Sequence, residues 1–192
     1  QAEFHVATES SFVAGHSLGE YSALTVAGTF SLGDAARVLK MRGQSMQQAV
    51  PVGQGAMAAI IGVDLDVAEE IAAEAAGEDI CTAANDNAPG QIVLSGSASA
   101  ITRAVEIAKE NGAKRSIVLP VSAPFHCALM APAADVMSEA LADITLQPPV
   151  VPVVANVTAA PEEDPGKIRR LLIEQVTSRV RWRECILKMR EL

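Results

Sequence analysis

With 192 residues, 49% of them hydrophobic and 20% charged, the chain can bury the core of one domain, or of one domain with an insert. Its net charge of −8 argues against a nucleic-acid partner, and no apolar run approaches the roughly 20 residues of a membrane helix. Cys81, Cys127 and Cys185 fit no disulfide framework and no zinc motif, so we expect a cytoplasmic protein with reduced thiols, no metal and no cofactor.

Both ends of the sequence fall inside predicted helices. The chain opens at Gln1 within a helical stretch over residues 1–9 and closes at Leu192 within another over residues 184–192. Neither stretch carries a Gly or Pro stop signal at the chain end, so we expect flanking sequence to be missing on both sides.

The first elements predict a strand followed by two helices. An apolar run ending in glycine predicts a buried strand over residues 11–16, and a helix follows over residues 18–27. A second helix is predicted from Ser31 to about residue 49, with Asp34 completing the outline of a capping box.

The middle of the chain has a different pattern. It predicts, in order, elements over residues 56–63 (strand), 64–76 (helix), 80–84 (strand), 91–95 (strand), 97–111 (helix) and 115–121 (strand). The Asn, Asp, Pro and Gly of residues 85–90 predict a turn between the second and third strands. The order β-α-β-β-α-β is that of the ferredoxin-like unit, so residues 54–121 are interpreted as an inserted subdomain.

The last third returns to alternating helices and strands. A helix over residues 129–144, a strand over 150–156 and a helix over 165–177 are predicted. Strands separated by helices favour a parallel sheet covered on both faces. The fold class is therefore α/β, with a discontinuous core built from residues 1–53 and 122–192.

The pentapeptide Gly15-His16-Ser17-Leu18-Gly19 is the sharpest local signal. It fits the pattern G-x-S-x-G, follows a predicted strand and opens a predicted helix. Such a turn lifts the serine Oγ clear of the sheet and directs the first helix amides at the reaction centre. Ser17 is therefore the candidate nucleophile, and the Leu18 N–H is the candidate oxyanion donor.

A serine nucleophile needs a base, and the chain has three histidines. His5 lies in the leading helix, and His16 is adjacent to Ser17, so its side chain does not face that serine. His126, in a loop after a predicted strand, is the candidate base. Cys127 is a weaker candidate nucleophile.

An acid that would orient the base is not identified from the sequence. The candidates between the serine and the histidine all fall on residues of the insert pattern and remain open: Asp64, Asp66, Asp79 and Asp86.

Arg42 falls in the middle of an apolar helical stripe formed by Ala35, Val38, Leu39, Met46 and Ala49. A buried guanidinium needs an anion, and its planar fork suits a carboxylate. The alternatives are an internal salt bridge, a side chain that reaches the solvent, or a substrate carboxylate held in the site.

Three stretches together resemble the malonyl-coenzyme A:acyl carrier protein transacylases. They are GHSLGEYSAL (residues 15–24), MRGQSMQQAVP (41–51) and VSAPFHCALM (121–130), and two weaker matches are NDNAPGQIVLSG (85–96) and VRW (180–182). The resemblance implies a hydrolase-like core with a ferredoxin-like insert. It also implies Ser17 as nucleophile, His126 as base, Leu18 N–H in the oxyanion hole and Arg42 as anchor of the malonyl carboxylate. Four further residues are implied to bind substrate: His16, Met46, Asn87 and Phe125.

The same resemblance implies malonyl-coenzyme A and acyl carrier protein as partners, for fatty acid biosynthesis, with the protein as a monomer. In the family a backbone carbonyl orients the histidine, and a glutamine loop adds to the oxyanion hole. We expect the glutamine loop upstream of Gln1 and the carbonyl downstream of Leu192. A basic cluster is a candidate surface for an acidic carrier protein: Lys167, Arg169, Arg170, Arg179, Arg181 and Arg183. The alternatives to this function are a serine esterase or thioesterase, and a degenerate carrier-binding module.

Overall fold

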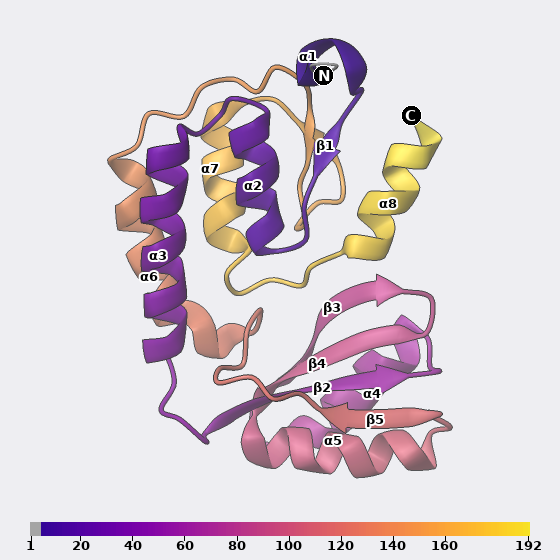
Figure 1. Ribbon diagram of the computed structural model, residues 1–192. Helices are drawn as coiled ribbons and strands as arrows, with labels where there is room; N and C mark the ends of the chain where they lie inside the picture. Colours follow the sequence, from indigo (N-terminus) through magenta and orange to yellow (C-terminus); the bar gives the residue numbers. More distant parts are fainter. Residues whose placement is uncertain (1–4) are drawn as a thin grey trace.

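This computed structural model describes residues 5–192, which form a mixed α/β structure of two packed bodies (Figure 1). The helices are α1 (Val6–Glu9), α2 (Leu18–Val26), α3 (Leu32–Gln48), α4 (Leu65–Ala76), α5 (Ala98–Glu110), η1 (Ala128–Met130), α6 (Ala131–Ala142), α7 (Pro165–Glu174) and α8 (Trp182–Glu191). The strands are β1 (Val13–Ala14), β2 (Gly55–Ile61), β3 (Cys81–Ala88), β4 (Gln91–Ser97), β5 (Arg115–Val118), β6 (Val153–Val154) and β7 (Pro161–Glu162). Residues 1–4 of the predicted leading helix lie outside the described part.

The helical body comprises α1, α2, α3, α6, α7, α8 and a short sheet of order β1-β6-β7. β1 and β6 pair in parallel, as predicted, but β7 pairs antiparallel with β6. The predicted parallel pairing is confirmed for β1 and β6, whereas β7 was not predicted and makes the sheet mixed. Only residues 155–160 join β6 to β7, and so short a link cannot hold the crossover that parallel pairing requires.

Helix α3 shows how the pattern of the sequence sets the packing of this body. Its N-cap is Ser31, whose side chain accepts a hydrogen bond from Asp34 N over 3.0 Å, as the capping outline predicted. Its buried stripe packs against α6 and α2 in one apolar core. The largest fully buried side chains of that core are Tyr21, Leu24, Met46, Met130, Met137, Leu141 and Leu172.

The sheet body comprises β2–β5 with α4 and α5, in the sequence order strand, helix, strand, strand, helix, strand. Its strands are antiparallel in the order β3-β4-β2-β5, and both helices cover one face (Figure 1). Along β2, Ala58 and Ile60 point into the core beneath the helices, whereas Met57 belongs to a cluster on the other face with Phe125. That second face lies toward the helical body.

β3 extends through most of the predicted turn, so the turn prediction was wrong over residues 85–88 and right only at Pro89 and Gly90. The strand runs to Ala88, and only Pro89 and Gly90 turn the chain, with Gly90 at φ 69°. Two register shifts, between Ala83 and Asn85 and between Asp86 and Ala88, let the strand accommodate polar residues that ordinarily favour bends.

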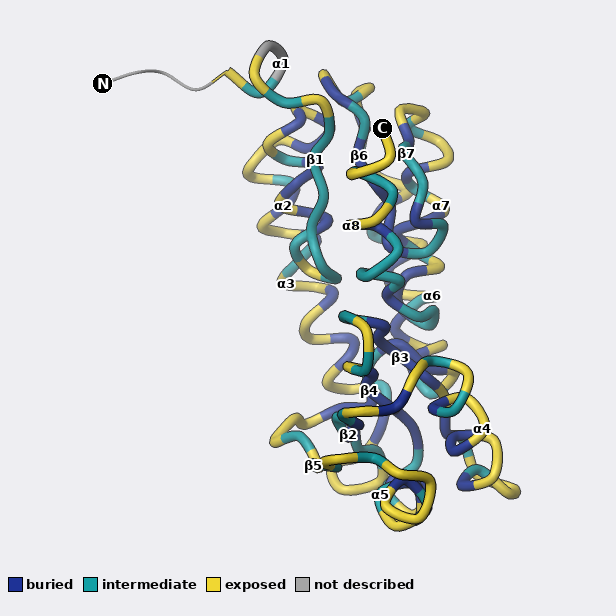
Figure 2. Tube along the Cα trace, turned by 90° about the vertical axis from the view of Figure 1, so that its right-hand side faces the viewer, coloured by how far each residue is buried: buried dark blue, intermediate teal, exposed yellow. Residues whose placement is uncertain are grey.

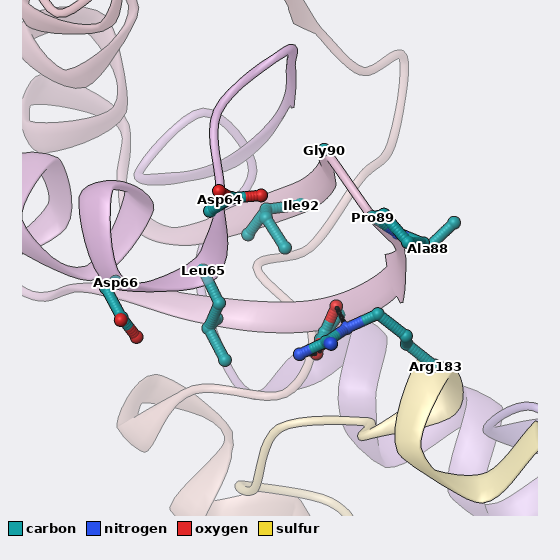
Figure 3. A pocket seen from close by; sticks show the side chains of 9 residues that line it. Asp64, Leu65, Asp66, Ala88, Pro89, Gly90, Ile92 and Arg183 are labelled. Carbon is teal, nitrogen blue, oxygen red and sulfur yellow. Dashed lines mark hydrogen bonds and ion pairs between the residues drawn. The ribbon is translucent and has the colours of Figure 1, made fainter. Parts of the chain in front are cut away.

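The two bodies are joined along this irregular strand. Asn85 forms a parallel bridge with Val180, Asp86 N donates to Val180 O (3.0 Å), and Val180 N donates to Ala84 O (2.9 Å). From the first turn of α8, Arg183 Nε donates to both carboxylate oxygens of Asp86, at 3.0 and 2.9 Å (Figure 3). In Figure 2 the inward sides of α2 and α3 are buried and their outward sides are exposed.

Several element boundaries differ from the predictions. β1 and β6 are shorter than the predicted strands over 11–16 and 150–156, and β5 ends at Val118, although Leu119 N still donates to Met57 O (2.8 Å). The predicted helix over 129–144 is divided into η1 and α6. No helix within residues 5–192 is long and apolar enough to cross a bilayer.

Candidate active site

Ser17 lies on a strained turn between β1 and α2. Its backbone has φ 52° and ψ −107°, a region that a residue with a side chain rarely occupies. The turn is so tight that a Cβ on Gly15 would lie only 1.9 Å from Gly19 O, so glycine is required at position 15. Gly19 N donates to His16 O (2.8 Å) and Glu20 N to Ser17 O (3.0 Å), whereas Leu18 N–H has no backbone partner within residues 5–192. A free amide at a helix N-terminus is suited to an oxyanion.

Ser17 and His126 are brought together from positions far apart in the sequence. Ser17 Oγ lies 2.7 Å from His126 Nε2, and His126 Nδ1 lies 2.8 Å from Gln175 O. A carbonyl oxygen only accepts, so Nδ1 carries the proton of the neutral ring and the lone pair of Nε2 faces the serine. The serine hydroxyl therefore donates to a nitrogen that is ready to take its proton.

The group that orients the histidine is a main-chain carbonyl within the described chain. Gln175 is the C-cap residue of α7, and its carbonyl points at the imidazole instead of continuing the helix. The expectation that this carbonyl lies downstream of Leu192 was therefore wrong. Of the acids left open by the sequence, Asp79 bonds to Arg103 and Asp86 to Arg183.

Burial keeps the imidazole neutral. His126 is 5% exposed, and desolvation lowers its pKa from 6.5 to about 4, against a smaller opposing effect of the hydrogen bond to Gln175. The adjacent Cys127 is also buried, its thiol donates to Pro124 O, and burial raises its pKa. A thiol in that environment is a poor nucleophile.

Arg42 is buried at the predicted position, 6% exposed, in the apolar stripe of α3. Its Nη2 donates to Ser17 Oγ (2.9 Å) and to Gln175 Oε1 (3.1 Å), and the guanidinium carbon lies 5.7 Å from the centre of the Tyr21 ring. Arg42 Nε is buried without a hydrogen-bond partner in the described residues. Burial lowers the pKa of Arg42, and the guanidinium forms no ion pair with a carboxylate of residues 5–192.

A cleft of about 440 Å³ opens over these groups between the two bodies. It is lined by His16, Ser17, Leu18, Arg42, Gly43, Met46, Gln47, Met57, Asn85, Leu119, Val121, Phe125 and His126. The lining includes His16, Met46 and Phe125, which the resemblance placed at the substrate. Asn87 is not part of it. Instead its Oδ1 accepts from His16 Nε2 (2.8 Å), while the ring of His16 meets Trp182 edge-on.

Three buried polar residues behind the serine were missed in the sequence: Glu20, Asn156 and Gln175. Asn156 Oδ1 accepts from Ser17 N (2.6 Å) and its Nδ2 donates to Gly15 O (2.8 Å), so it holds the turn from both sides. Glu20 had a readable signal, because it shares the buried face of α2 with Ala23 and Leu24. Asn156 had a weak signal, because it lies just after a strand end. Gln175 had none, because it acts partly through its main-chain carbonyl, which every residue type carries.

The basic cluster is mostly occupied by contacts within the molecule. Its ion pairs are Lys167–Glu162, Arg179–Glu69, Arg181–Glu184 and Arg183–Asp86, and Arg169 donates to main-chain carbonyls near the end of α6. The described residues contain no group of three or more His, Cys, Asp or Glu side chains placed to hold a metal ion.

A serine, a histidine and a buried cation meet in one cleft, an arrangement that can support nucleophilic acyl chemistry and can hold an anionic group. The chain belongs to the acyl transferase domain family, whose model matches residues 7–192. It is 48% identical over 174 residues to a malonyl CoA-acyl carrier protein transacylase of Escherichia coli (strain K12), covering 91% of this chain and 56% of that protein.

Solved structures agree with this family. The acyl-carrier-protein-S-malonyltransferase from Bartonella henselae superposes with a TM-score of 0.95 at 56% identity, covering 98% of this chain and 60% of that one. A type II PKS acyl-carrier protein in complex with its malonyl-transacylase gives a TM-score of 0.92 at 44% identity, covering 94% and 59%. The chain thus spans somewhat more than half the length of the relatives it matches.

Proposed function

We propose that this protein transfers malonyl groups from malonyl-coenzyme A to the phosphopantetheine thiol of acyl carrier protein, through a malonyl ester on Ser17. The observation that carries the proposal is the pair of contacts on one oxygen. Ser17 Oγ lies 2.7 Å from His126 Nε2 and 2.9 Å from Arg42 Nη2, so the nucleophile lies between a base and a carboxylate-binding cation. The family and the names of its relatives support the same reaction.

In the first half-reaction, Ser17 Oγ attacks the thioester carbonyl while His126 Nε2 takes its proton. The tetrahedral oxyanion is held by Leu18 N–H at the start of α2. When the intermediate collapses, the C–S bond breaks, and the proton on His126 goes to the departing coenzyme A thiolate. The ester to Ser17 remains.

In the second half-reaction, the carrier thiol gives its proton to His126, and its sulfur attacks the malonyl ester. Collapse then breaks the bond to Ser17 Oγ, which recovers the proton from His126. The two halves use the same base and the same amide, so the enzyme ends unchanged. The largely apolar lining of the cleft favours the pantetheine thiol over water as acceptor because apolar walls hold water poorly.

Arg42 supplies the selectivity for an acyl group that carries a carboxylate. The guanidinium is buried, its Nε is unpaired in the described residues, and burial lowers its pKa. A malonyl carboxylate relieves that deficit, whereas an acetyl group leaves the cation unpaired. This contact favours the transacylase over a serine esterase that acts on neutral acyl groups.

On the architecture, we propose that residues 54–121 are a ferredoxin-like subdomain inserted in a hydrolase-like core of residues 1–53 and 122–192. The strand order and the two helices on one face support this division. The cleft lining draws Met57, Asn85 and Leu119 from the insert, so the insert contributes a wall of the site. A monomer in the cytoplasm, working in fatty acid biosynthesis, is part of the same proposal.

Mass spectrometry of the intact protein after exposure to malonyl-coenzyme A tests the reaction. We expect a mass increase of one malonyl group in the wild-type protein and in Cys127→Ser, and none in Ser17→Ala. Addition of acyl carrier protein should remove the adduct and load the carrier. An adduct that survives Ser17→Ala contradicts the mechanism. Rapid loss of the adduct to water identifies an esterase, and carrier binding without any adduct identifies a degenerate module.

A further inference from the structure

Glu20 is a buried acid that the reaction above does not use. It is 2% exposed, one turn into α2 from the nucleophile. Its Oε2 accepts from Asn156 N (2.9 Å) and from Gln175 Nε2 (2.9 Å). Burial raises the pKa of Glu20 to about 7, despite both of these hydrogen bonds. A buried carboxyl at that cost needs a role that an apolar side chain could not fill.

Gln175 connects Glu20 to the nucleophile, the base and the cation of the site. Its Nε2 donates to Glu20 Oε2 and to Ser17 O (3.1 Å), its Oε1 accepts from Arg42 Nη2, and its main-chain oxygen accepts from His126 Nδ1. One residue therefore contacts the nucleophile, the base and the cation together.

The direction of the Gln175 amide is fixed by its neighbours. Glu20 and Ser17 O offer acceptors on one side, while Arg42 offers a donor on the other. A half-turn of the amide would place its NH₂ against the guanidinium and its oxygen against two acceptors. Of the two acceptors, the carboxyl oxygen of Glu20 is the only one supplied by a side chain, so it is the one that a substitution can remove.

We propose that Glu20 is a positioning residue: by holding the amide of Gln175, it fixes the guanidinium of Arg42 and the imidazole of His126 relative to Ser17 Oγ. The inference rests on the proposed function, since it assigns Glu20 a part in malonyl selection. Without that acceptor the amide can rotate, Arg42 loses its partner, and the residue whose carbonyl orients His126 loses an anchor.

Two substitutions of similar size separate positioning from simple packing. Glu20→Gln keeps an acceptor oxygen for Asn156 N and Gln175 Nε2, whereas Glu20→Met fills the same space without one. We expect Glu20→Met to lower kcat/KM for malonyl-coenzyme A about tenfold or more, with a smaller loss for acetyl-coenzyme A. Glu20→Gln should recover most of the malonyl rate and of the malonyl preference.

Nuclear magnetic resonance gives a readout that does not depend on turnover. In ¹⁵N-labelled protein, the Nδ1–H signal of His126, assigned by its loss in His126→Ala, should persist in Glu20→Gln and shift or broaden in Glu20→Met. If wild-type protein forms no malonyl ester, the proposed function fails, while this signal still decides whether Glu20 positions the imidazole.

Thermal unfolding accompanies both measurements. If Glu20→Met is folded but keeps both its malonyl preference and its His126 signal, Glu20 is only structural and the proposal is overturned. The proposal is also overturned if Glu20→Gln loses as much as Glu20→Met, because the hydrogen bond would then not be the operative feature. Should Glu20→Met fail to fold, Glu20→Asp, which withdraws the acceptor by one methylene, is expected to show the same loss of malonyl preference, and an unchanged preference contradicts the proposal.

Discussion

The main-chain oxygen of Gln175 accepts a hydrogen bond from His126 Nδ1 over 2.8 Å, in the position where many serine enzymes place an acid. A neutral carbonyl fixes the tautomer and the direction of the ring but supplies no full negative charge to stabilise an imidazolium. Burial is then the dominant effect on the ring, and it lowers the pKa of His126 to about 4. This relationship has a direct consequence for the pH dependence of the reaction.

We expect acylation of Ser17 to hold its rate from neutral pH down to about pH 5 and to fall as pH approaches 4. The base is active when neutral, and its folded pKa is about 4, below the ordinary 6.5. Single-turnover acylation by malonyl-coenzyme A across this range, with circular dichroism at each pH, measures the acid limb. A limb centred near pH 6.5 in folded protein would contradict a desolvated base.

The same shift contributes to stability. Because the folded pKa of His126 is depressed, its contribution is present above pH 6.5 and is lost as pH falls toward 4. The pKa shift of Glu20 changes stability with pH in the opposite direction. Its folded pKa is raised from 4.5 to about 7, so its contribution is present below pH 4.5 and is lost as pH rises through 7. Glu20→Gln should therefore flatten the decline of stability between pH 5 and 7, as measured by urea unfolding.

Replacing Arg42 should change which acyl group is transferred. With Arg42→Ala we expect kcat/KM for malonyl-coenzyme A to fall roughly 100-fold, with a much smaller change for acetyl-coenzyme A, because only the malonyl carboxylate loses its partner. Arg42→Lys keeps the charge without the planar fork, so its kcat/KM for malonyl-coenzyme A should lie between those of the wild-type protein and of Arg42→Ala. Competition between the two thioesters followed by mass spectrometry measures the preference. An unchanged preference in Arg42→Ala would remove the carboxylate role.

The nucleophile, the cation and the base of this site were predictable because local sequence patterns indicate their positions. The strand–turn–helix context of residues 15–19 placed Ser17, and the position of Arg42 within an apolar stripe predicted its burial. His126 followed from its place after a strand and from the scarcity of histidines. The inferences on Ser17 and Arg42 used only near neighbours in the sequence and the period of a helix or a strand, whereas the choice of His126 also used the number of histidines in the chain.

The remainder depends on contacts that no local pattern records. The carbonyl of Gln175 reaches His126 across 49 residues, and any residue type would present the same atom. Short strands such as β7, with two residues, carry too little alternation to be recognised. Asn85 and Asp86 predicted a turn because of their intrinsic preference, which the contacts of β3 with Val180 and Arg183 override.

The two glycines of the serine turn should differ in their tolerance of substitution. A Cβ on Gly15 would collide with the backbone of Gly19 at 1.9 Å, whereas a Cβ on Gly19 meets nothing within 4 Å. We expect Gly15→Ala to cost about 3 kcal/mol or to prevent folding. Gly19→Ala should leave stability unchanged or raise it by up to about 1 kcal/mol, because alanine is the better helix former. Urea unfolding of the two variants compares them, and equal stabilities would show that the turn can relax.

The ion pair between Arg183 and Asp86 should contribute more to stability than a surface pair on the same helix. The side chain of Asp86 is fully buried, whereas both side chains of the Lys188–Glu191 pair reach solvent, at 39% and 67% exposed. We expect Arg183→Met to lower the free energy of unfolding by about 2–3 kcal/mol, because the Asp86 carboxylate stays buried without its cation. Lys188→Met, the matched control, should cost less than about 0.5 kcal/mol.

The double variant Asp86→Asn with Arg183→Met decides whether the loss comes from an unpaired charge. If it does, removing the carboxylate should restore part of the stability that Arg183→Met alone loses, since a neutral amide is cheaper to bury than an isolated anion. If the loss comes instead from the packing of the Arg183 stem against β3, the double variant should be no more stable than the single one. Because β3 also brings Asn85 to the cleft, a loosened junction should raise the KM for malonyl-coenzyme A in Arg183→Met and leave it unchanged in Lys188→Met.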